Sequence, residues 1–175
     1  MNANTLAEQG KQEYGKGAYG NAADLFAQAA QAYSNLQDEL SAAEMKNNQS
    51  VALLKAGKAE AALQATDGTE EIFQKAGDRK RQGVAIANRA AALEGLKKLN
   101  EAVTEYNRAA DIFEEVGEGD MHSVVRKATA EIFLKRGYIG NTQMDVFDSL
   151  RLVEKPTFSQ RILKFLMRLG FLKPR

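Results

Sequence analysis

The sequence predicts an all-α protein: an α-α superhelix of four helix-turn-helix repeats, followed by a C-terminal helix. Three observations predict it. Turn residues recur with a period of 40, apolar residues between the turns are spaced by three and four, and no proline occurs before Pro156. Alternation of apolar and polar residues, which is typical of strands, occurs nowhere at useful length.

The period is marked at the turn inside each repeat. The turn positions are Gly17, Gly57, Lys97 and Gly137. Five residues after each turn comes a small residue: Ala22, Ala62, Ala102 and Thr142. Nine residues after each turn come Phe26, Thr66, Tyr106 and Val146, and the second repeat departs most from the pattern. A glycine ends the first helix in the left-handed conformation, and the small residue allows the two helices to approach closely.

These turns divide the chain into units of about 1–38, 39–78, 79–118 and 119–154, which together form a repeat array over 1–154. Asp78 and Asp120 are expected to cap helix N-termini. The expected helices are about 4–16, 19–36, 39–56, 59–76, 79–96, 99–116, 120–136 and 140–154, with a ninth at 157–170.

Composition argues against an enzyme. The chain has no cysteine and one histidine, His122, so zinc sites and Ser/His or Cys/His catalysis lack their parts. No phosphate-binding glycine loop is present. We therefore expect no catalytic residue, no metal, no cofactor and no nucleic-acid partner. The absence of a signal peptide and of an 18-residue apolar stretch predicts a cytoplasmic protein, with peripheral membrane association as an alternative.

The repeats resemble the tetratricopeptide repeat (TPR) family. The first unit carries the resemblance in Gly10, Tyr14, Gly17, Tyr19, Ala22, Phe26 and Ala29. The third carries it in Ala90, Leu93, Leu99, Ala102, Tyr106 and Ala109, and the fourth in Ala130, Phe133, Gly137 and Ile139. The longer period is similar to the variants found in kinesin light chains and in the attachment proteins of membrane fusion. The resemblance implies a right-handed solenoid whose concave groove, lined by the first helix of each unit, binds a peptide or helix of another protein.

The resemblance also implies where a partner would bind. In this family an Asn of the first helix often bonds a bound peptide's backbone, and Asn48 and Asn88 occupy that place. The lysine-rich clamp for C-terminal carboxylates is not reproduced. The candidate groove residues are Lys11, Asn47, Asn48, Lys55, Asn88, Lys127 and Glu131. The alternative is that most of them only solubilise exposed helix faces.

The last segment, residues 155–175, is predicted to be a basic amphipathic helix. It carries six of the 24 Lys and Arg residues and no acidic residue, so its net charge is +6 and that of residues 1–154 is −5. Its basic stripe and its extra apolar surface are formed by Arg161, Leu163, Lys164, Met167, Arg168 and Phe171. Three roles remain open: capping the solenoid, lying on an anionic membrane, or binding a partner or a second copy. The leading hypothesis is a non-enzymatic adaptor or scaffold, and the alternative is a peripheral membrane assembly or trafficking factor.

Overall fold

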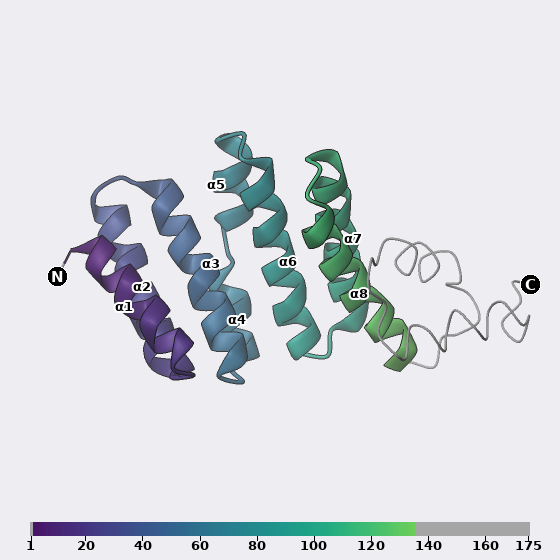
Figure 1. Ribbon diagram of the computed structural model, residues 1–175, viewed down its shortest axis with the longest axis horizontal. Helices are drawn as coiled ribbons and strands as arrows, with labels where there is room; N and C mark the ends of the chain where they lie inside the picture. The colour runs from purple at the N-terminus through teal and green to yellow at the C-terminus, as the bar shows by residue number, and fades with distance from the viewer. Residues whose placement is uncertain (1, 136–175) are drawn as a thin grey trace, which may run out of the picture.

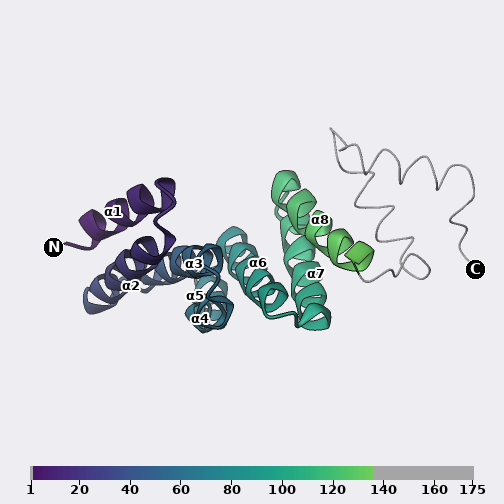
Figure 2. The same cartoon turned by 90° about the horizontal axis from the view of Figure 1, so that it is seen from below.

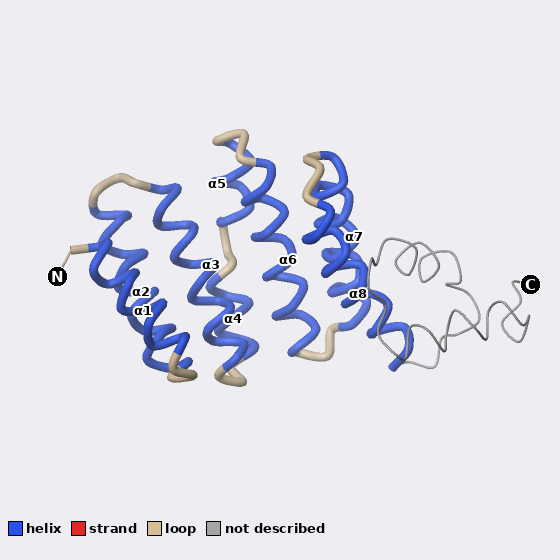
Figure 3. Tube along the Cα trace, viewed as in Figure 1, coloured by secondary structure: helices blue, strands red, loops and turns tan. Residues whose placement is uncertain are grey.

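The computed structural model describes residues 2–135, and this part of the chain is all-helical (Figures 1 and 3). The predicted fold class is confirmed, because most helices pack against the next helix along the chain in an α-α superhelix. The helices are α1 (Ala3–Gly15), α2 (Tyr19–Asn35), α3 (Glu39–Lys55), α4 (Ala59–Ala65), α5 (Thr69–Lys75), α6 (Arg79–Gly95), α7 (Leu99–Glu115) and α8 (Gly119–Lys135). The helices expected at 140–154 and 157–170 lie outside the described residues.

The turns repeat every 20 residues, twice as often as the sequence period indicates. A left-handed residue ends the helix at Gly17, Gln37, Gly57, Gly77, Lys97 and Gly117. The same backbone hydrogen bond closes each turn: the Ala18 N–H donates to the Glu13 carbonyl at 3.0 Å, and the Glu118 N–H donates to the Phe113 carbonyl at 2.8 Å. This is the Schellman closure of a helix C-terminus. Turns within and between units therefore share one geometry.

One expected helix is wrong. The segment predicted as a single helix over 59–76 consists of α4 and α5, separated at Gly68, whose φ is +76°. The Thr66 hydroxyl donates to the Leu63 carbonyl at 2.7 Å, and the Thr69 hydroxyl donates to the Thr66 carbonyl at 2.8 Å. Threonine side chains thus satisfy carbonyls that a continuous helix would bond with its own backbone. Thr66 stands where units one and three have the aromatic residues Phe26 and Tyr106, so no large side chain holds the two halves in line.

The helix N-termini on the two edges of the molecule differ in whether a side chain caps them. Asn2, Asp38 and Asp78 precede α1, α3 and α6, and each side chain accepts from the backbone N–H three residues later. Ala18, Lys58 and Lys98 precede α2, α4 and α7 and make no such bond. Asp120 was expected as an N-cap but lies inside the first turn of α8, because α8 begins at Gly119.

The core forms where aromatic side chains of second helices pack on small residues of first helices. Phe26 of α2 lies against Gly10, where an added Cβ would come within 2.8 Å of the ring. Phe113 of α7 packs in the same way on Gly83 of α6. One large cluster of buried residues joins α1 to α4, and a second joins α6 to α8. The small residues predicted from the sequence therefore set the distance between helices.

Candidate protein-binding face

The first helices of the units, α1, α3, α6 and α8, follow one another along one side of the molecule. In Figure 2, α1 at one end and α8 at the other stand above α3 and α6, so the row curves. α3 and α6 contact each other directly. We refer to the surface formed by the exposed side chains of these four helices as the first-helix face.

Asn48 of α3 and Asn88 of α6 occupy the same place in consecutive units. Both are partly exposed, and neither amide has a hydrogen-bond partner among residues 2–135. An amide both donates and accepts, so it can bond a peptide backbone from either side. The structure thus leaves two equivalent amides, on helices in contact, with their hydrogen-bonding capacity unused.

The charged candidates on this face are paired within the chain. Lys11 of α1 lies 2.8 Å from Glu8, and this hydrogen bond raises the pKa of the lysine. Lys127 and Glu131 of α8 lie 3.8 Å apart. Exposed pairs of this kind contribute little stability, because water and salt screen them. They remain available for exchange with a partner's charges.

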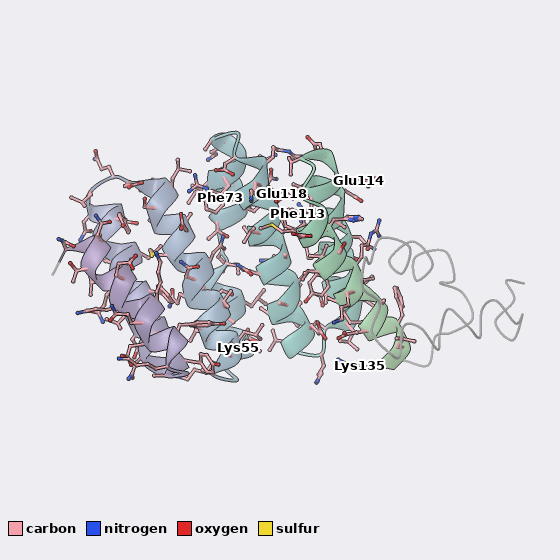
Figure 4. The ribbon with its side chains drawn as sticks, in the orientation of Figure 1. Lys55, Phe73, Phe113, Glu114, Glu118 and Lys135 are labelled. Carbon is pink, nitrogen blue, oxygen red and sulfur yellow. The ribbon has the colours of Figure 1, made fainter. Side chains whose placement is uncertain are left out.

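Two candidates lie elsewhere. Asn47 has only 4% of its surface exposed, so its side chain is not on the first-helix face. It lies between Ala43 and Ser50 on one stripe of α3, and this stripe faces the α4–α5 segment, because the Ser50 hydroxyl donates to the Ala62 carbonyl at 2.8 Å. The Asn47 Oδ1 has no hydrogen-bond partner within residues 2–135. Lys55 is exposed at the end of α3, on the edge formed by the turns within units (Figure 4).

Contacts between α3 and α6 identify further residues of the candidate site that the sequence did not indicate. Arg81 of α6 donates to Glu44 of α3 at 3.3 Å and to Asp78 at 2.6 Å, and its guanidinium lies 5.2 Å from the centre of the Phe73 ring. Arg81 and Glu44 differ in type from the residues at the matching places of other units, so the repeat pattern gave no signal for this pair. They join the first helices of units two and three.

His122 lies at the start of α8 and is buried. The Arg126 Nε–H donates to His122 Nε2 at 3.4 Å, and burial followed by the charge of Arg126 lowers the pKa of the imidazole. Within residues 2–135, no group of three or more His, Asp or Glu side chains is placed to hold a metal ion. No helix in the same range combines the length and apolar character needed to cross a bilayer. The C-terminal candidates Arg161 to Phe171 lie outside the described residues.

A curved row of first helices carrying free amides and exchangeable charges defines a helical-repeat protein of the class that binds other proteins. The chain belongs to the soluble NSF attachment protein (SNAP) family, whose family model matches residues 7–173. No individually curated protein matches the chain significantly. The family match confirms the part of the predicted resemblance that concerns the attachment proteins of membrane fusion, and an attachment protein acts by binding other proteins.

Proposed function

We propose that this chain is a non-enzymatic adaptor that links an NSF-type ATPase to a second, helical protein held on its first-helix face. The observation that carries the proposal is the family match over residues 7–173, which names attachment to NSF as the family's activity. The free amides of Asn48 and Asn88 support the position assigned to the second protein. Cytoplasmic location, in part at membrane surfaces, belongs to the same proposal.

The mechanism is recognition by a scaffold whose helices are already in place. A partner helix laid across α3 and α6 would meet two amides in register, with charged pairs on either side. Each amide hydrogen bond to a partner contributes about 1 kcal/mol, and apolar anchors on the partner supply the rest. Lys11, Lys127 and Glu131 would exchange their intramolecular pairs for pairs with the partner.

The experiment compares two amide double variants of the full chain. Asn48→Ala/Asn88→Ala removes the proposed contacts, and Gln28→Ala/Gln64→Ala removes two exposed amides from second helices as a matched control. Each tagged chain recovers proteins from a detergent extract of the organism's membranes, with the NSF-type ATPase present. We expect the first variant to keep the ATPase but recover about 10-fold to 30-fold less of the second protein, from two hydrogen bonds lost. Equal recovery of the second protein by the two variants would contradict the assignment of its binding site to the first-helix face.

A second candidate function is peripheral membrane binding by residues 155–175, which the +6 charge of this segment favours. It concerns Arg161, Lys164 and Arg168, with Leu163, Met167 and Phe171 as apolar contacts. Flotation of the full chain and of a chain ending at residue 155 with anionic vesicles tests it. Equal flotation of both chains contradicts this role, and equal masses by light scattering contradict self-association through the segment.

A further inference from the structure

Among residues 2–135, one edge of the solenoid carries lysine at or beside the turn within each of units one to three and at the end of α8. We define the lysine edge as Lys16, Lys55, Lys58, Lys97, Lys98 and Lys135, all exposed. The turns that bear them lie together along the lower edge in Figure 1, and Figure 4 shows Lys55 and Lys135 on that edge. The turns between units lie along the opposite edge.

Close packing at Gly95 brings two of these turns together. A Cβ added at Gly95 would lie 2.9 Å from the Ala59 Cβ and 2.9 Å from the Leu54 Cδ1, so the end of α6 fits directly against the α3–α4 turn. Four lysines, Lys55, Lys58, Lys97 and Lys98, are thereby gathered in one region. None of the four side chains makes a hydrogen bond or ion pair with another residue in the 2–135 range.

Three of these lysines occupy positions where lysine weakens the fold. Lys58 and Lys98 are the N-cap residues of α4 and α7, where their charge opposes the positive end of the helix and their side chains make no capping bond. Lys97 adopts a φ of +62° at a turn position that is Gly in the first two units. Asparagine at the caps and glycine at the turn would suit the backbone better. Residues that break a local rule in this way are expected where function, not stability, selects them.

The opposite edge of the solenoid differs from the lysine edge in its N-caps and in the pairing of its cations. There the N-caps are Asp38 and Asp78, which make the expected bonds. Two cations on that edge are neutralised, since Arg79 pairs with Glu115 and Lys80 lies 2.6 Å from Glu118, and Lys75 is the exposed lysine there without an ion pair among residues 2–135. Unpaired positive charge at turns is therefore concentrated on one edge of the solenoid, at the junction of units two and three.

We propose that the lysine edge docks on the anionic lipid headgroups of a bilayer. The cations are all lysine, which acts as a mobile point charge, whereas recognition of carboxylates in a protein usually employs the fixed fork of arginine. They project from turn tips along an edge, which suits a flat, diffuse field of charge. In this orientation the helix ends meet the membrane, and the first-helix face stays open to a protein. The proposal uses residues of the repeat array and is independent of residues 155–175.

The test is vesicle binding by a variant that removes charge without weakening the fold. Lys58→Asn/Lys98→Asn, made in the full chain, deletes two lysines and supplies better caps. Binding is measured by co-sedimentation with phosphatidylcholine vesicles containing about 30% phosphatidylserine, at low salt. Each lysine near an anionic surface contributes about fivefold in partition coefficient, so we expect about 25-fold weaker binding together with a higher melting temperature. Lys97→Gly should act in the same direction, with about fivefold weaker binding and no loss of stability.

The control is Lys75→Gln/Lys80→Gln, which removes the same charge from the opposite edge. A loss of at least tenfold in the edge variant, with the control within twofold of the parent, supports the proposal. A smaller loss in the edge variant, or an equal loss in the control, overturns it. Soluble polyglutamate serves as an acidic protein probe. If the edge variant loses polyglutamate binding but keeps vesicle binding, the edge is a protein site and the membrane proposal is wrong.

Discussion

Units two and three follow the same register but are built differently. In unit three, α7 runs unbroken from Leu99 to Glu115, and Tyr106 is buried in its middle, where its hydroxyl donates to Glu94 at 3.1 Å. Burial raises the pKa of that phenol, which therefore stays a donor. In unit two the matching residue is Thr66, and the helix is interrupted two residues later. The continuous and the broken helix thus differ at this aromatic position and at the next two residues, where unit two has Asp67-Gly68 and unit three has Asn107-Arg108.

The break also divides the hydrophobic core. Phe73 of α5 forms a small separate cluster with Ala43 and Ala85, whereas its counterpart Phe113 belongs to the large cluster of α6 to α8. Across the junction of units two and three, ion pairs connect the helices. Arg108 of α7 lies 2.6 Å from Glu70, and Arg89 of α6 lies 3.5 Å from Asp67. The comparison teaches that the repeat tolerates loss of an aromatic residue when ion pairs join the neighbouring units.

The largest effect is expected from truncating the two matched phenylalanines. Phe113→Ala should lower the free energy of unfolding by about 3–5 kcal/mol, because it leaves a cavity in a large cluster. Phe73→Ala should cost less, because α5 has only seven residues and its small cluster can relax around the gap. Urea unfolding of both variants measures the difference. Equal losses would show that the core is continuous through unit two.

A smaller effect is expected where the first helices differ at one matched position. Gly83 meets Phe113, and an added Cβ would lie 2.7 Å from its Cε1, whereas unit two already has Ala43 beside Phe73. Gly83→Ala should therefore lower stability by about 1–3 kcal/mol, although alanine favours helix more than glycine does. Thermal unfolding measures the change, with the open position Gly119→Ala as the control. A stabilised Gly83→Ala would contradict the packing described for unit three.

The smallest expected effect on stability comes from removing the N-cap that begins unit three. Asp78 accepts from the Arg81 N–H at 2.9 Å, and this bond, followed in smaller part by the Arg81 side chain, lowers the pKa of the carboxyl. Asp78→Ala should cost about 1 kcal/mol at neutral pH. Because the folded-state pKa is depressed, this contribution is present above the unfolded pKa of about 3.9 and lost as pH falls through the folded value. Urea unfolding at several pH values measures it, and a difference that does not shrink in acid would contradict the ionised cap.

The sequence predicted most of the fold because turns and apolar spacing are local signals. Within residues 2–135, the helix boundaries lie within about one residue of those expected, apart from the break in unit two. That break had a signal, the turn dipeptide Asp67-Gly68, which the alignment of repeats hid. The site was harder to predict. Asn47 and Asn48 are neighbours, but one step along a helix rotates a side chain by about 100°, so only the packing of α4 and α5 decides which is buried.

Direct binding of the purified full chain to the NSF-type ATPase of its own organism tests the central claim, that this protein is an attachment adaptor. Sedimentation velocity of the two proteins together, compared with each alone, measures it. The proposed function predicts that the 19.2 kDa chain moves with the much larger ATPase. Independent sedimentation of the two at concentrations of about 10 μM, where even a weak specific complex would be populated, would contradict the account.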